Sequence, residues 1–402
     1  MSMENSYNGK KVLVRVDFNV PLDKNFKITD DTRILGALPT IQHLLANNAA
    51  VILMSHLGRP QKKKLENGEL DVEKFTLKHV VDHLSSLLNK NVQFSTDLVG
   101  KDARDKAREL KGGEVLLLEN TRFEPGEEKG DDTLARSLSE LADYYVNDAF
   151  GTAHRAHAST AKVAQFFDSD HKSFGLLIEK EIKNANKVKE NPDSPYTAIV
   201  GGAKVSDKIL LLENLISKCD NILIGGGMAY TFFKALDGKV GNSLVEEDKL
   251  ELAKEILKKA TQNNTRILLP KDSIIADAFS NDANIQEVAS DQIPDGWMGL
   301  DIGTKAQSEF TEVIESSRTV MWNGPMGVFE MSNFANGSFS VAKALAKATK
   351  KGAFTMVGGG DSVSAVNQSG LSDQVSFVST GGGAMLEYLE GKELPGLKAI
   401  EE

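Results

Sequence analysis

The sequence predicts an α/β protein made of two Rossmann-like domains with mainly parallel sheets. Apolar runs of strand length alternate with amphipathic helical patterns along the whole chain, which is typical of βαβ units. The strand-like runs are almost continuously apolar, as in sheets covered by helices on both faces. At 402 residues the chain also exceeds the size at which one hydrophobic core stops growing.

The expected elements follow in order. In the first half the predicted strands are Val12–Asp17, Val51–Ser55, Val92–Phe94, Val115–Glu119 and Tyr144–Asn147, and the predicted helices are Arg33–Ala46, Leu77–Leu88, Asp102–Leu110 and Thr133–Leu141. In the second half the predicted strands are Ala198–Val200, Ile222–Ile224, Ile267–Leu269, Thr319–Trp322, Thr355–Val357 and Phe377–Val378, and the predicted helices are Asp248–Asn263, Ser338–Lys350 and Ala384–Leu389.

The chemistry-bearing residues divide the chain. All seven histidines precede residue 172, whereas four glycine clusters, at 201–202, 225–227, 358–360 and 381–383, lie in the second half. A long charged helical pattern, 176–191, ends before Pro192 and separates the halves. We therefore expect an N-terminal domain, 1–175, an interdomain helix, 176–191, a C-terminal domain, 192–385, and a tail, 386–402, which returns to the N-terminal domain and is extended over its last dozen residues.

Composition narrows the function. A net charge of −10 argues against binding to nucleic acid, and no apolar run is long enough to span a membrane. The single cysteine, Cys219, excludes an internal disulfide and fits a reducing compartment, so we expect a cytoplasmic protein.

In the first half, arginine, histidine and short polar side chains follow the predicted strands. Because ligands of open α/β sheets bind beyond the carboxyl ends of the strands, these residues suit a small ligand with phosphate, carboxylate and hydroxyl groups. They are Asp17, Asn19, Arg33, His56, Arg59, Arg122 and Arg155.

In the second half the corresponding positions carry glycines. The segment after Val200 turns on Gly201 and Gly202, and we expect it to enter a helix directly, with Lys204 and Lys208 on one helix face. No Walker A pattern occurs, and the dinucleotide fingerprint fails at its third glycine, where Tyr230 or Val363 stands. A different nucleotide site remains, with backbone N–H groups on phosphates, Asp361 on Mg²⁺ and Glu330 on the ribose.

Six segments together carry a family resemblance. They are Arg15-Val-Asp-Phe-Asn-Val-Pro21, Ser55-His-Leu-Gly-Arg-Pro60, Gly201-Gly-Ala-Lys-Val-Ser-Asp-Lys208, Gly225-Gly-Gly-Met-Ala229, Trp322-Asn-Gly-Pro-Met-Gly-Val-Phe-Glu330 and Ser379-Thr-Gly-Gly-Gly-Ala384. In order and spacing they resemble the phosphoglycerate kinases over essentially the whole chain. Thr121, Met385 and Thr304 depart from the pattern and affect only local packing.

The resemblance implies reversible phosphoryl transfer between 1,3-bisphosphoglycerate and ADP, giving 3-phosphoglycerate and ATP, in line and after domain closure. It implies Mg²⁺ as the cofactor, held through Asp361, and a monomer. The first-half set above would bind 3-phosphoglycerate. The nucleotide would bind Gly202, Lys204, Lys208, Gly226, Gly299, Leu300, Asn323, Val328, Glu330, Gly359, Gly360, Asp361 and Ser362, while the transferring charge would be met by Arg33, Lys204, Gly360 and Gly383. Two alternatives stay open: a sugar-phosphate dehydrogenase, against which the failed fingerprint counts, and a non-catalytic nucleotide sensor, which would typically lack Arg33 or Lys204.

Overall fold

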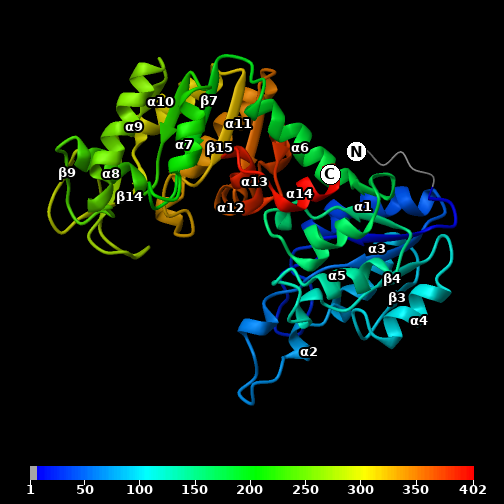
Figure 1. Cartoon of the computed structure of the whole chain (residues 1–402). Helices are drawn as coiled ribbons and strands as arrows, with labels where there is room; N and C mark the ends of the chain where they lie inside the picture. The colour runs from blue at the N-terminus through cyan, green and yellow to red at the C-terminus, as the bar shows by residue number, and fades with distance from the viewer. Residues whose placement is uncertain (1–6) are drawn as a thin grey trace. The chain divides into compact units, whose positions relative to one another are not determined.

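The computed structural model describes residues 7–402, and the chain divides into two compact units. The first unit extends to Ile182 and also contains Glu393–Glu402, whereas the second is Lys183–Lys392. In each unit helices flank a parallel sheet (Figure 1). The prediction of an α/β protein with two parallel-sheet domains is therefore confirmed.

Six parallel strands form the sheet of the first unit, in the order β3-β4-β2-β1-β5-β6. The strands are β1 (Lys11–Arg15), β2 (Ala50–Met54), β3 (Val92–Phe94), β4 (Val115–Leu117), β5 (Tyr144–Asn147) and β6 (Lys172–Phe174). The helices are α1 (Thr32–Ala46), α2 (Val72–Phe75), α3 (Lys78–Leu88), α4 (Lys101–Glu109), α5 (Asp132–Ser139) and α14 (Pro395–Glu401). Short 3₁₀ turns are η1 (Pro60–Lys62), η2 (Thr121–Phe123), η3 (Phe150–Thr152), η5 (Val163–Phe166) and η6 (Ser169–His171), and η4 (Ala158–Lys162) is a π-helix.

The core of this unit explains its apolar strands. All five residues of β2 are buried, and Val51 and Leu53 pack in one cluster with Ile34 and Leu44 of α1. A sheet covered on both faces selects near-continuous apolar strands, since neither face meets water.

The second unit has a six-stranded parallel sheet in the order β10-β8-β7-β15-β16-β17. Its strands are β7 (Tyr196–Val200), β8 (Asn221–Ile224), β10 (Arg266–Leu268), β15 (Thr319–Asn323), β16 (Phe354–Gly358) and β17 (Phe377–Val378). The helices are α7 (Ile209–Ile216), α8 (Met228–Ala235), α9 (Leu250–Gln262), α10 (Thr304–Glu315), α11 (Asn336–Lys350), α12 (Gly360–Gln368) and α13 (Gly382–Leu389), with 3₁₀ turns η7 (Glu247–Lys249), η8 (Ser332–Phe334) and η9 (Ser372–Gln374). Strand order reverses between the neighbours β7 and β15, which is where such folds bind ligands.

Two small sheets complete the second unit, and the sequence analysis did not predict them. An antiparallel sheet has the order β12-β11-β14 and a parallel pair is β13-β9. Their strands are β9 (Lys239–Val240), β11 (Asp272–Ala276), β12 (Ile285–Ala289), β13 (Gln292–Ile293) and β14 (Met298–Ile302). Strand β14 carries Gly299 and Leu300, two of the residues predicted to bind the nucleotide.

Helix α6 (Leu176–Lys189) contains the boundary between the two units. Among the described residues, no helix combines the length and the apolar character needed to cross a membrane.

Two further predictions of local structure are wrong. The C-terminal residues are not an extended tail, because Pro395–Glu401 forms α14 with proline in its first turn, a position that suits a residue without an N–H. Helix α7 begins only at Ile209, so Lys204 and Lys208 precede it and do not share a helix face.

Candidate active site

The first unit gathers several predicted residues beyond the carboxyl ends of β1 and β2. Asp17 is nearly buried, and its Oδ2 accepts a hydrogen bond from Arg33 Nη1 at 2.5 Å. Arg33 is at the start of α1 and stays 42% exposed. The pair therefore fixes one end of the guanidinium while leaving part of it accessible to an anion.

A second group of contacts orders the turn after β2. Asn19 Oδ1 accepts a hydrogen bond from Gly58 N at 2.8 Å, and Arg122 Nη1 donates to Gly58 O at 2.8 Å. Asn120 supports this arrangement, since its Oδ1 accepts from the backbone N–H groups of Leu57 and Arg122. Gly58 has a φ of +63°, which a glycine adopts without strain.

His56 is buried at the centre of the cationic residues. Burial lowers the pKa of His56 well below its ordinary value, and the charges of Arg15, Arg122 and Arg33 lower it further. Arg122 is itself affected, because burial lowers its pKa and nearby Arg15 and Arg59 act in the same direction. The structure thus brings Arg33, His56, Arg59 and Arg122 into one electrostatic environment.

Arg59 and Arg155 differ from the other members of the set. Both are exposed, and neither side chain hydrogen-bonds or forms an ion pair with another described residue. Arg155 lies close enough to His157 to lower the pKa of that histidine, although burial is the larger cause. Their guanidinium groups are available to a ligand.

A buried network that includes Arg15 was not predicted from the sequence. Arg15 is 1% exposed, and its Nε donates to Ser159 Oγ at 2.8 Å. Ser159 Oγ in turn donates to a carboxylate oxygen of the buried Glu127. The motif that contains Arg15 was noticed, but nothing in the sequence places residues 127 and 159 beside it.

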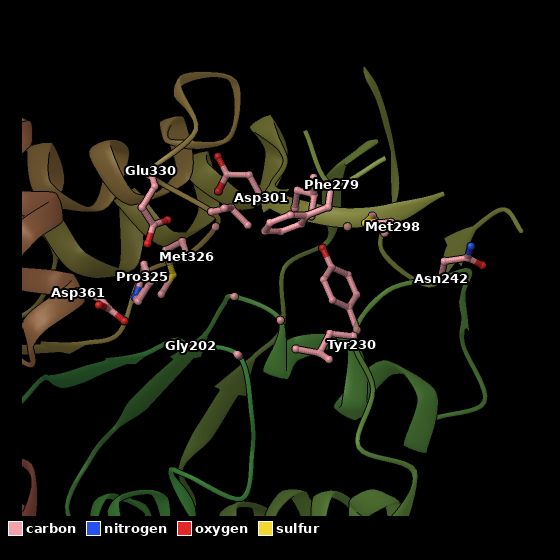
Figure 2. Close-up of a pocket in the computed structure, with 18 residues that line it drawn as sticks. Gly202, Tyr230, Asn242, Phe279, Met298, Asp301, Pro325, Met326, Glu330 and Asp361 are labelled. Atoms are coloured by element: carbon pink, nitrogen blue, oxygen red, sulfur yellow. The ribbon is translucent and has the colours of Figure 1, made fainter. Parts of the chain in front are cut away.

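The second unit contains a cavity of about 500 Å³ beyond β7 and β15. Seven of the predicted nucleotide residues line it: Gly202, Gly226, Gly299, Leu300, Val328, Glu330 and Asp361. Figure 2 shows the carboxylates of Glu330 and Asp361 on one side of the cavity and the rings of Tyr230 and Phe279 away from them, with Asp301 beside Phe279. The cavity therefore offers both carboxylates and an aromatic surface, as a nucleotide requires.

Close packing explains why glycines occupy this wall. A Cβ on Gly299 would lie 1.9 Å from the hydroxyl oxygen of Tyr230. A Cβ on Gly226, whose φ is +71°, would lie 2.5 Å from the carbonyl oxygen of Gly202. A side chain at either position would therefore overlap with atoms of the cavity wall.

Four other predicted residues do not line the cavity but contact one another at the ends of β15 and β16. Lys208 Nζ donates to Asn323 Oδ1, and Asn323 Nδ2 donates to Gly358 O at 3.1 Å. Ser362 Oγ accepts from Gly324 N at 2.7 Å, and Gly359 adopts a φ of +90° beside Asn323. Burial lowers the pKa of Lys208. This cluster shapes the backbone next to Asp361.

The remaining predicted residues lie at loops and helix starts. Gly360 is the first residue of α12, and Gly383 lies in the first turn of α13, where unbonded N–H groups suit an anion. Lys204 is exposed in the segment before α7. Asp361 and Ser362 lie in the first turn of α12, whose N-cap residue is Gly359.

Several cavity residues escaped the sequence analysis, notably Tyr230, Phe279 and Asp301. Asp301 accepts hydrogen bonds from Gly337 N at 2.7 Å and Ile302 N at 2.9 Å, and burial raises its pKa to about 7. Tyr230 was noted only as a failed fingerprint position. Phe279 lies between β11 and β12, in a part of the chain where no strand was predicted.

The residues at the polar end fit a magnesium ion that accompanies a nucleotide. Asp361 is exposed on the cavity wall, and its carboxylate has no hydrogen-bond or ion-pair partner among the described residues. Across the same residues no group of three or more His, Cys, Asp or Glu side chains could hold a metal ion. Mg²⁺ commonly needs only one or two carboxylates when substrate phosphates supply other ligands.

Comparisons with known proteins agree over the full chain. The family model described as phosphoglycerate kinase matches residues 3–392. Phosphoglycerate kinases of Porphyromonas gingivalis and Thermosipho africanus are 51% and 53% identical; each alignment covers 98% of this chain, and 98% and 95% of the respective relatives. The solved phosphoglycerate kinase of Coxiella burnetii is 40% identical with a TM-score of 0.88, covering 100% of this chain and 98% of that one. The enzyme from Pyrococcus horikoshii is 32% identical with a TM-score of 0.82, covering 99% and 97%.

Proposed function

The chain belongs to the phosphoglycerate kinase family, and from this premise we propose how its own residues carry out the reaction. The activity is reversible phosphoryl transfer from 1,3-bisphosphoglycerate to ADP. A β-phosphate oxygen of ADP attacks the phosphorus of the acyl phosphate, and the carboxylate of 3-phosphoglycerate leaves. Both the attacking and the leaving oxygens are anionic, so no general base is needed.

We propose that the first unit binds 3-phosphoglycerate. Arg59 and Arg155 offer exposed guanidinium groups, whereas Arg122 is half-buried and His56 is buried. Arginines bind phosphate and carboxylate through paired N–H donors, which favours these side chains for the two anionic ends of the substrate. Asp17 and Asn19 would lie near its hydroxyl group.

The second unit is the proposed nucleotide site. The cavity beyond β7 and β15 supports this assignment more than any other observation, because the rings of Tyr230 and Phe279 suit a base and the carboxylates of Glu330 and Asp361 lie away from them. Glu330 would accept hydrogen bonds from the ribose. Backbone N–H groups near Gly202, Gly226, Gly359 and Gly360 would meet the phosphates, together with the cluster of Lys208, Asn323 and Ser362. Gly299, Leu300 and Val328 would contact the base.

Catalysis would then depend on position and charge. We assign Arg33 and Lys204 to the charge on the transferring phosphoryl oxygens, with the N–H groups of Gly360 and Gly383 at their helix starts. Mg²⁺, bound through Asp361, would neutralise charge on the nucleotide phosphates. Because each ligand is assigned to a different unit, we also propose that the units close to bring the reacting groups into line and to exclude water.

A turnover assay with Mg-ATP and 3-phosphoglycerate tests the proposal, with product formation followed through a coupled enzyme. The same mixture without the coupling enzyme should give no change in nicotinamide absorbance, which separates the activity from that of a dehydrogenase. Failure of turnover with intact binding of both ligands would instead favour a nucleotide sensor. We further propose that the protein is a monomer, as the family resemblance suggests. We also propose that it is cytoplasmic, because its single cysteine, Cys219, is buried and free.

A further inference from the structure

His56 has two ring nitrogens in different surroundings. Arg15 Nη2 lies 3.2 Å from His56 Nδ1. A guanidinium group can only donate hydrogen bonds, so Nδ1 must accept and cannot carry a proton. His56 Nε2 has no hydrogen-bond partner among the described residues, and it is not one of the buried polar atoms without a partner, so it retains some exposure to solvent.

Arg15 is held so that it cannot turn away from His56. Its Nε donates to Ser159 Oγ at 2.8 Å, and its Nη1 donates to the carbonyl oxygen of Val16. Glu127 completes the chain of contacts: it accepts from the Ser159 hydroxyl and, at 2.9 Å, from Ser159 N. Arg15, Ser159 and Glu127 are all at most 1% exposed.

The local fold supports a dedicated arrangement. Ser159 lies in the π-helix η4, and such turns are rare and often occur at functional sites. Within this turn, both Ser159 N and Ser159 Oγ donate to the carboxylate of Glu127.

From this geometry we propose that Arg15, positioned by Ser159 and Glu127, holds His56 as the neutral tautomer with its proton on Nε2, which then donates to an anionic oxygen of 3-phosphoglycerate. The inference rests on the proposed function, because it assumes that His56 contacts this substrate. Arg15 is a positioning residue, since it acts through His56. The arrangement is similar to that of a metal-bound histidine. There, the hydrogen bond made by one ring nitrogen determines which nitrogen carries the proton and which one can bind the metal.

The charged groups around His56 also favour a neutral imidazole. Arg15 on β1, Arg33 on α1, Arg122 on η2 and His157 before η4 all act on the imidazole. Each disfavours a positive charge on His56, as does its burial, so the ring stays neutral at neutral pH. A neutral ring can donate from Nε2 only if Nδ1 is the acceptor.

Nuclear magnetic resonance of the ¹⁵N-labelled full-length protein tests the tautomer directly. We expect long-range proton–nitrogen correlations to show Nε2 protonated and Nδ1 unprotonated from pH 6 to pH 8, without ligand. A protonated Nδ1, or a charged ring in this range, would overturn the inference while leaving the enzymatic proposal untouched.

Two variants test the function of the contacts. Ser159→Ala should populate the other tautomer and raise the dissociation constant of 3-phosphoglycerate by roughly threefold to tenfold, the effect of weakening one hydrogen bond, without changing that of ADP. Ser139→Ala, which loses only a hydroxyl bonded to its own helix end, is the matched control and should change neither. Arg15→Lys keeps the charge but cannot make all three contacts, so it should behave like Ser159→Ala. Unchanged tautomer and binding in both variants would refute the role of Arg15, whereas loss of wild-type turnover would refute the proposed function instead.

Discussion

Lys204 is, with Arg33, one of the two residues whose charge the proposed mechanism uses mainly during transfer. We expect Lys204→Ala to lower kcat by about 10²–10³ while nucleotide affinity changes far less, because the charge it meets develops in the transition state. Steady-state kinetics and calorimetry with ADP measure the two effects. Lys258→Ala removes an exposed lysine of α9 and should leave both unchanged. An unchanged kcat in Lys204→Ala would remove Lys204 from catalysis.

A substitution of Arg155 tests whether 3-phosphoglycerate and the nucleotide bind to different units. Its exposed guanidinium has no partner in the described protein, so Arg155→Ala should weaken 3-phosphoglycerate binding on the order of tenfold to a hundredfold, the range for a charged hydrogen bond. ADP binding should persist. Arg108→Ala is the control, since Lys11 Nζ donates to Arg108 O and places this arginine at the opposite end of β1. Equal loss of both ligands in calorimetry would contradict the assignment.

Individual site residues were predictable where they belong to a short stretch beside a strand end. His56 and Arg59 follow β2, and Asp361 follows β16, so the sheet rule alone places them at the ligand edge. Glu127 and Ser159 were not predictable in this way, because each lies far along the chain from Arg15 and the contact depends on a π-helix. Phe279 follows a strand of mixed polarity and carries no motif.

The start of helix α6 illustrates an effect at the level of an element. Asp148 Oδ1 accepts from Leu177 N at 2.9 Å, while its buried Oδ2 has no hydrogen-bond partner. Burial raises the pKa of Asp148 to about 7, against 3.8 in an unfolded chain. Between these values the folded state binds the extra proton. The stability contributed by this group is therefore complete below about pH 4 and is lost as the pH rises to 7.

Asp148→Asn should remove this pH dependence, since an amide stays neutral and its oxygen can still accept from Leu177. We expect the variant to exceed wild type in free energy of unfolding by on the order of 1–3 kcal/mol at pH 8 and by little at pH 4.5. Hydrogen exchange of first-unit amides measures both. Asp168→Asn, at an exposed position, should show no such difference. If the difference in free energy of unfolding between Asp148→Asn and wild type is the same at pH 4.5 and at pH 8, Asp148 does not titrate between these pH values.

Helix α14 is the second element with a clear energetic consequence. Asn147 Nδ2 donates to Gly396 O at 3.0 Å, and the buried Lys172 Nζ donates to Ala399 O at 2.9 Å. Deleting residues 395–402 would expose the surface under Ile400 and leave both donors without partners. We expect the first unit to unfold at lower denaturant concentration, because it loses these two hydrogen bonds and the burial of Leu397 and Ile400.

Amide hydrogen exchange, followed separately in the first and the second unit, measures the effect of the deletion. The second unit should keep its stability and its affinity for ADP. A deletion that left first-unit protection intact would show that α14 contributes nothing there. A shorter deletion, of Glu402 alone, serves as control because that residue is exposed.

The elements themselves were predictable to different degrees. The long parallel strands and their helices were predicted because burial on both faces leaves apolar runs. The sheet β12-β11-β14 was missed because Ile285–Ala289 is mostly exposed and shows no such run. Helix α14 was missed because Pro395 and Gly396 resemble a breaker pair, although proline is favoured in a first helical turn.

At the scale of the molecule, the proposed mechanism predicts a response to ligands. We expect 3-phosphoglycerate and a non-hydrolysable ATP analogue together to reduce the radius of gyration, and each alone to change it little, since only both ligands link the two units. A single compact globule of this length would have a radius of roughly 21 Å, so the starting value should exceed this. Small-angle scattering measures it. At ligand concentrations that just saturate the wild type, the Arg155→Ala variant should keep its unliganded radius of gyration. If the radius of the wild type is the same with and without the two ligands, closure of the units is ruled out.

The return of α14 to the first unit also governs how the protein can be made. Proteins emerge from the ribosome N-terminus first, and domains usually fold in that order during synthesis. Here Leu397 and Ile400 are buried in the first unit, yet they are synthesised after the whole of the second unit, Lys183–Lys392. The first unit must therefore remain incomplete while the second unit is being made, until Pro395–Glu401 has also left the ribosome.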